Sequence, residues 1–200
     1  MAVSKDFTIE QGRTFTQLIY WADEDKIVYK PITGATQTAP VRLTVTGHSL
    51  TNGWPVAVTN VKGMTELNAE ANAVKDKDYT PTTIIDPDTI ELNAINAAGF
   101  KAYTSGGYIQ YFQPVDLTGY TARMTVKDKV GGTELLSLTS ANSRVTIDAT
   151  NKTITLTITA VDTAAITWSK GVYDLEMVSP SNVVTAILTG KVTVTKEVTT

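Results

Sequence analysis

Few side chains in this sequence have the types and spacing that catalysis requires. His48 is the only histidine, and there is no cysteine. A general base, a nucleophilic triad or a metal site needs several such groups placed together, and one histidine cannot supply them. His48 follows Gly47 in a segment rich in turn-forming residues, so we expect it to be a turn residue. The lack of cysteine also excludes disulfides and cysteine-dependent redox or nucleophilic chemistry.

Acidic residues gather in two short stretches, and closely spaced carboxylates are the groups from which calcium loops are built. Asp86 and Asp88 flank a proline, and Asp76 and Asp78 lie shortly before them. The glycine and the closing glutamate of a calcium loop are missing, so we predict solvated turns here and at residues 23–25. Carboxylates that cleave glycosides are defined by their separation in space, so the sequence leaves that chemistry open. We predict no catalytic residue, no metal and no cofactor.

Aromatic side chains are the other candidate site. Trp54, Tyr108 and Tyr111 could form a surface that contacts a protein partner or a carbohydrate. Aromatic residues dominate both protein cores and protein interfaces, so packing in the core or at its rim is the alternative. The sequence therefore nominates these three residues as an interaction surface without deciding between the two roles.

The composition indicates which elements must position these residues. The chain has 200 residues, a net charge of -3, 18% charged residues and 35 threonines. Threonine and valine favour strands, and a mildly acidic chain lacks the basic footprint of a nucleic-acid-binding protein. No apolar stretch is long enough to span a bilayer, and the first residues lack a signal-peptide core. We therefore expect an all-β protein that folds in a cytoplasm and contacts neither nucleic acid nor membrane.

Period-two alternation predicts about a dozen short strands, separated by turns, as in β-sandwiches and barrels. The clearest is residues 153–159, where Ile154, Leu156 and Ile158 share one face and threonines the other. Residues 160–166 form the best helix candidate. The fold class we predict is an antiparallel β-sandwich.

A change in composition divides the chain. Residues 35–112 are richer in asparagine and alanine than the threonine-rich segments on either side. We predict a discontinuous β-sandwich formed by residues 1–34 and 113–200, with a small β-barrel of residues 35–112 inserted into it. Exposed loops tolerate such insertions. The sandwich has 12 basic and 13 acidic residues and the insert 5 and 7, so neither is strongly charged, which favours protein partners.

The order of motifs in the outer segments resembles a β-sandwich of bacteriophage tail proteins, the N-terminal domain of the baseplate upper proteins of lactococcal phages. The resemblance covers about 120 residues. Its motifs are FTIEQGRTF (7–15), VDLTGY (115–120), RMTV (123–126), VTID (145–148), TITL (153–156), TAAI (163–166), GVYDLE (171–176) and LTGKVTV (188–194). About 80 additional residues before the second motif depart from this family, in which that connection is short.

Part of the insert is similar to a small β-barrel module first described in ubiquitin-activating enzymes and also found in phage structural proteins. The matching residues are GHSL (47–50), NG (52–53), Val56, Val61 and GMTELN (63–68). Only the barrel carries over, because that family's nucleotide site and catalytic cysteine lie outside the module.

The two resemblances imply a structural virion protein of a tailed phage, in the tail, baseplate or fibre-attachment apparatus. Such a protein acts by assembly with other virion proteins, and we expect a homo-oligomer on the particle, a trimer or a hexamer. A neck or capsid decoration protein and a carbohydrate-binding adhesin remain alternatives. An enzyme is not expected.

Overall fold

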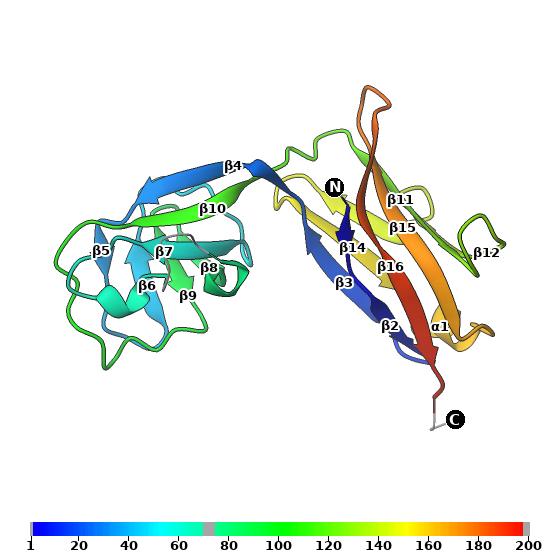
Figure 1. The fold of residues 1–200 in the computed structure, drawn as a ribbon, viewed down its shortest axis with the longest axis horizontal. Helices are drawn as coiled ribbons and strands as arrows, with labels where there is room; N and C mark the ends of the chain where they lie inside the picture. The colour runs from blue at the N-terminus through cyan, green and yellow to red at the C-terminus, as the bar shows by residue number, and fades with distance from the viewer. Residues whose placement is uncertain (1, 70–74, 198–200) are drawn as a thin grey trace. The chain divides into compact units, whose positions relative to one another are not determined.

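The structure, a computed structural model, describes residues 2–69 and 75–197. It is mostly β, with 51% of residues in strands, one short α-helix and three antiparallel or mixed sheets. The prediction of an all-β chain is therefore confirmed. The chain divides into two compact units, residues 1–21 with 116–200 (unit 1) and residues 22–115 (unit 2). Each unit is described separately below (Figure 1).

Unit 1 contains two sheets. In the larger one, β16 (Val184–Thr195) pairs with β15 (Lys170–Val178), which continues through β11 (Thr121–Lys127) to β12 (Glu134–Thr139). Two N-terminal strands, β1 (Val3–Ser4) and β2 (Phe7–Glu10), run parallel to β16 at its other edge. The second sheet has the order β13 (Val145–Asp148), β14 (Thr153–Ile158) and β3 (Phe15–Tyr20). Sequence-distant segments therefore meet in both sheets.

The core of unit 1 follows the predicted alternation. Ile154, Leu156 and Ile158 are at most 1% exposed, while the threonines between them are half-buried. Phe7 of the larger sheet and Phe15 of the smaller sheet form an edge-to-face pair with centroids 5.7 Å apart, which joins the inner faces of the two sheets.

The predicted helix is also confirmed. Helix α1 (Ala160–Ala164) begins after Thr159, whose hydroxyl accepts the backbone N–H of Asp162 at 3.1 Å as an N-cap. It is the one α-helix of the described residues, and none of their helices is long and apolar enough to cross a membrane.

Unit 2 is built on one seven-stranded sheet. From one edge to the other, its strands are β4 (Ala22–Pro31), β10 (Tyr108–Pro114), β7 (Pro55–Thr59), β8 (Thr80–Asp86), β9 (Thr89–Leu92), β6 (Val41–Thr44) and β5 (Gly34–Ala35). Two 3-10 turns, η1 (Thr65–Leu67) and η2 (Asp76–Asp78), complete it.

The structure corrects the predicted barrel. The seven strands form an open path that ends at β4 and β5, and no closed barrel is found among the described residues. Alternation in the sequence indicates which face a strand buries, but it carries no information on whether the last strand pairs with the first. Here β5 has only two residues, too few to close the path along the ten residues of β4.

The division between the units also differs from the predicted ranges. Unit 2 begins at Ala22 and ends at Val115, whereas the insert was expected to span residues 35–112. The difference arises because β4 pairs along β10, from Tyr108 opposite Pro31 to Pro114 opposite Ala22. This pairing brings residues 22–34 into unit 2, and it cannot be read from the composition shift.

Candidate functional site

Two of the three aromatic residues nominated from the sequence are core residues. Trp54 is 1% exposed, and its indole N–H donates to the carbonyl oxygen of Phe112 at 3.2 Å. Tyr111 is 5% exposed, and its hydroxyl donates to the carbonyl oxygen of His48 at 3.2 Å. Burial raises the pKa of Tyr111. Neither side chain is available as an interaction surface, so of the nominated residues only Tyr108 is exposed.

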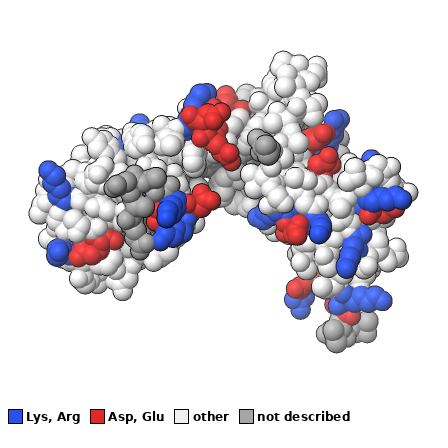
Figure 2. Space-filling model, viewed as in Figure 1, with Lys and Arg blue, Asp and Glu red and all other residues white. Residues whose placement is uncertain are grey.

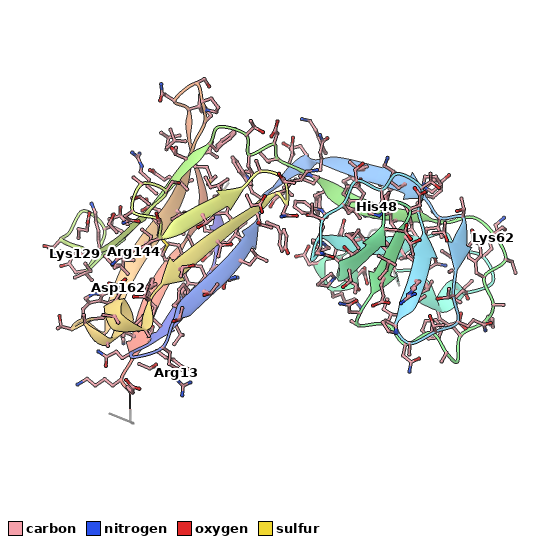
Figure 3. The ribbon with its side chains drawn as sticks, turned by 180° about the vertical axis from the view of Figure 1, so that it is seen from behind. Arg13, His48, Lys62, Lys129, Arg144 and Asp162 are labelled. Carbon is pink, nitrogen blue, oxygen red and sulfur yellow. The ribbon has the colours of Figure 1, made fainter. Side chains whose placement is uncertain are left out.

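His48 is a buried residue in an otherwise exposed turn of unit 2, where Figure 3 labels it. It is 2% exposed, and its Nδ1 accepts the backbone N–H of Leu50 at 3.0 Å. Because Nδ1 is an acceptor, the ring proton is on Nε2, which donates to the carbonyl oxygen of Asp86 at 2.9 Å. Both nitrogens are thus occupied by backbone groups, and the residue ties the turn after β6 to the end of β8.

The carboxylates of the acidic turns also bind backbone groups. Asp86 accepts the N–H of Asp88 at 2.8 Å, and Asp88 accepts the N–H of Gly47 at the same distance. The bond from the N–H of Asp88 favours the ionised form of Asp86 and is the main reason that the pKa of Asp86 lies below its usual value. Among residues 2–69 and 75–197, no group of three acidic or histidine side chains is placed to hold a metal ion.

A depression of about 200 Å³ lies in unit 1, where β11, β15 and β16 meet the loop after β11. Its lining contains two lysines, Lys127 and Lys129, and one acid, Asp174, together with threonine hydroxyls. The lining holds no histidine and no hydrogen-bonded pair of a nucleophile and a base. Val130 and Val172 complete the lining with apolar groups, so the depression is a hollow of the sheet surface with mixed polar and apolar walls.

Exposed apolar side chains gather instead at one edge of unit 2. Ile27 and Tyr29 of β4 are 44% and 55% exposed, and Tyr108 of β10 is 44% exposed. The register places Tyr108 opposite Pro31, Tyr29 opposite Gln110, and Ile27 opposite Phe112. Residues directly opposite in a pair of strands share a face. We call this surface the tyrosine strip, and it comprises Ile27, Tyr29, Pro31, Tyr108 and Phe112.

On the side away from the sheet edge, the tyrosine strip ends at a cluster of three side chains, Tyr79, Gln110 and Phe112. The ring of Tyr79 stacks on Phe112, with centroids 5.5 Å apart and planes at 23°. The hydroxyl of Tyr79 accepts the side-chain N–H of Gln110 at 3.0 Å. Gln110 is buried in consequence, whereas Tyr29 and Tyr108 beside it stay exposed. The exposed part of the strip is thus the part next to the sheet edge.

The backbone of β4 is open along that edge. Ile32 donates its N–H to the carbonyl oxygen of Gly107 at 2.9 Å, which marks a hydrogen-bonded pair of residues. Such pairs alternate along antiparallel strands. Counted from Ile32, Tyr29 and Ile27 occupy non-hydrogen-bonded positions toward β10. Their N–H and C=O groups therefore point away from β10, and in the described part of the chain no strand pairs with β4 on that side.

The tyrosine strip is flanked by charge on one side. Between Ile27 and Asp23, residues 24–26 have no partner in β10, so the strand bulges there. Lys26 and Asp23 form a 2.9 Å ion pair across the bulge, and this contact is the main cause of the lowered pKa of Asp23. The regular, apolar part of the edge is therefore residues 27–31.

The sequence nominated Tyr108 but none of the residues of β4 that form this surface with it. The signal that could have found it is the spacing of Ile27, Tyr29 and Pro31 at every second position, with Lys30 between the last two. This pattern places three apolar side chains on one face of a strand that ends in proline, and proline is confined to sheet edges.

No protein-family model matches the sequence, and no curated protein matches it.

Proposed function

We propose that this chain is a structural protein of a tailed-bacteriophage particle, in the tail, baseplate or fibre-attachment apparatus, and that it acts by protein–protein assembly. The observation that carries the proposal is the tyrosine strip on the open edge of β4. Exposed apolar side chains beside unpaired backbone groups are typical of surfaces that other chains cover.

The fold of unit 1 is part of the same proposal. We interpret its two sheets as a β-sandwich of the kind found in phage baseplate proteins. The contact between Phe7 and Phe15 across the two inner faces supports this interpretation. So does the order of strands after β11, in which a hairpin (β13 and β14) is followed by a short helix and two long strands.

The charge distribution supports protein partners. Figure 2 shows acidic and basic side chains interspersed over the visible face, without a broad region of one sign. Several of these charges form surface ion pairs, such as Arg123 with Glu176 at 2.6 Å and Arg42 with Glu91 at 3.0 Å. A surface of this kind lacks the basic stripe of nucleic-acid binders. We propose that the chain has no enzymatic activity.

The test is the composition of intact particles. Phage particles are purified from cells that produce this chain, and their proteins are identified by mass spectrometry. We expect the chain to copurify at a constant ratio to the tail proteins. Electron microscopy of particles labelled with an antibody to the chain then distinguishes the tail apparatus from the neck and the capsid. Particles without the chain contradict the proposal.

A carbohydrate-binding adhesin is the second candidate, because Tyr29 and Tyr108 expose their rings on the same face of the strip. Exposed rings provide flat apolar surfaces with a polar hydroxyl at the tip. A glycan array read with the wild-type chain and with Tyr108→Ala distinguishes the candidates. Binding that the substitution abolishes would favour the adhesin.

A further inference from the structure

We propose that the open edge of β4 pairs with the same edge of a second copy of this chain, in antiparallel orientation, with Tyr29 opposite Tyr29 of the other copy. This inference names the partner of the tyrosine strip and rests on the proposed assembly function. The contact has two-fold symmetry, so each copy presents the same residues to the other.

The first argument is that β4 has the edge best suited to strand addition. It is the longest edge strand of unit 2, with ten residues against two in β5. Natural edges are protected from pairing by short strands, charged side chains, prolines and bulges. Here the bulge and four charged side chains lie at residues 23–26, and the protective residues within 27–31 are only Lys30 and Pro31 at the end of the strand.

The second argument is the register, because only one of the four central pairings avoids both like-charge contacts and the irregular residues 24–26. The outward N–H and C=O groups belong to alternate residues, so a two-fold pairing must be centred on a residue and not between two residues. Between the bulge and Pro31 at the end of β4, the possible centres are residues 27, 28, 29 and 30. A centre at Val28 places Lys26 opposite Lys30 twice, and a centre at Lys30 places two lysines opposite each other. Like charges directly opposite are destabilising. A centre at Ile27 extends into the irregular residues 24–26.

A centre at Tyr29 avoids all three problems. The two Tyr29 residues exchange their backbone hydrogen bonds. Ile27 of each copy faces Pro31 of the other and donates its N–H to the Pro31 carbonyl oxygen, while proline has no N–H to donate in return. Lys30 then lies opposite Val28, so no like charges meet. The exposed side chains of both copies become one continuous apolar surface, with Tyr108 beside it on each copy. The occupant that fits this edge is therefore an identical strand.

The oligomeric state tests the inference. Sedimentation velocity and light scattering on the full chain are expected to give twice its mass of 21.5 kDa. Tyr29→Lys places two lysines opposite each other at the centre, so this variant is expected to have the monomer mass. The matched control is Ile85→Lys, because Ile85 in β8 is 43% exposed, like Ile27, and lies away from β4. A wild-type chain that is monomeric at millimolar concentration overturns the inference, as does a dimer that Tyr29→Lys leaves intact.

Cysteine substitution tests the register, since the chain has no cysteine of its own. Residues directly opposite in antiparallel strands have Cα atoms within the distance that a disulfide spans. Under oxidation, Tyr29→Cys is expected to form a covalent dimer and Val28→Cys is not. Efficient crosslinking of Val28→Cys alone would overturn the register, because it would indicate a centre at Val28. Circular dichroism of each variant checks that it folds.

The outcomes separate this inference from the proposed function. The chain could be found in particles but be monomeric at millimolar concentration, with no crosslink of Tyr29→Cys on the particle. That result would overturn the pairing of β4 with a second copy and leave the proposed structural function standing. If the chain dimerises with the expected register but is absent from particles, the inference stands and the phage function is wrong.

Discussion

The hydroxyl of Tyr173 in β15 donates a 2.7 Å hydrogen bond to the backbone carbonyl oxygen of Lys5, 168 residues earlier in the chain. The ring of Tyr173 stacks on Phe7, with centroids 5.0 Å apart, and the side chain is 4% exposed. The bond lies between β1 and β2, where both strands pair with β16. One buried side chain therefore holds the N-terminal segment on the sheet formed by the C-terminal half of the chain.

Tyr173→Phe is expected to weaken unit 1 in a way that depends on pH. Burial, with a smaller effect of Asp6, raises the pKa of Tyr173 to about 12, above its value of 10.0 in the unfolded chain. The contribution of this proton to stability is complete below pH 10 and is lost as the pH rises toward 12. At pH 8 the variant is expected to lose about 1 kcal/mol for the missing hydrogen bond. Urea unfolding at pH 8 and 11 measures the difference, which should shrink at pH 11. A constant difference would contradict the raised pKa.

The local pattern of the sequence was sufficient for the elements of unit 1. Alternation over residues 153–159 predicted both the strand and its buried face, because burial on one side of a sheet repeats every second residue. The short helix was predicted from residues 160–166, and the structure places its N-cap at Thr159. Both features depend on neighbours in the sequence, which is why they can be read there.

The partners of β4 could not be predicted in the same way. Its pairing with β10 joins residues separated by most of unit 2, and nothing in either strand specifies the other. For the same reason the burial of the Trp54 and Tyr111 side chains could not be predicted from the sequence. An aromatic side chain has the same identity in a core and on a surface, and only the packing of the surrounding strands decides between them. Tyr108, in the same strand as Tyr111, illustrates this, because it is exposed.

Thr118→Val is expected to make unit 1 more sensitive to acid. Asp116 accepts hydrogen bonds from the hydroxyl and the N–H of Thr118, at 2.7 and 3.0 Å. These bonds, the one from the hydroxyl first, hold the pKa of Asp116 below 3.8. A lowered pKa stabilises the fold above the unfolded value, and this stabilisation is lost as the pH falls through the folded value. Because the variant loses one of the two bonds, its acid-unfolding midpoint should move to higher pH.

The control for Thr118→Val is Thr8→Val, which changes an exposed threonine of β2 in the same unit. Acid titration followed by circular dichroism compares the two variants with the wild-type chain. The same shift in both variants would assign the effect to the loss of any threonine hydroxyl and contradict the role of Asp116.

His48→Ala is expected to destabilise unit 2 by about 2–4 kcal/mol, since it leaves the buried N–H of Leu50 and the carbonyl oxygen of Asp86 without their partner and creates a cavity. Amide hydrogen exchange gives a local readout. The N–H of Leu50 bonds to the His48 ring, so its protection should fall more than that of the β9 amides. Thr46→Ala, at an exposed position two residues earlier, is the control. Unchanged protection of Leu50 would show that the ring is not its acceptor.

Gly107→Ala is expected to destabilise unit 2 more than Gly47→Ala, although both glycines have positive φ, +92° and +58°. An added Cβ at Gly107 would overlap the side chain of Val61 and lie 3.0 Å from its Cα, whereas at Gly47 it would meet no atom within 4 Å. The Gly47 variant should therefore lose about 1 kcal/mol for backbone strain alone. The Gly107 variant adds steric overlap, for a total of about 2–4 kcal/mol. Urea unfolding of both variants measures the two losses, and equal losses would contradict the close approach of Gly107 to Val61.

Because Gly107 precedes Tyr108 and accepts the N–H of Ile32, its substitution should also weaken the pairing of β4 with β10 and thereby the dimer proposed for that edge.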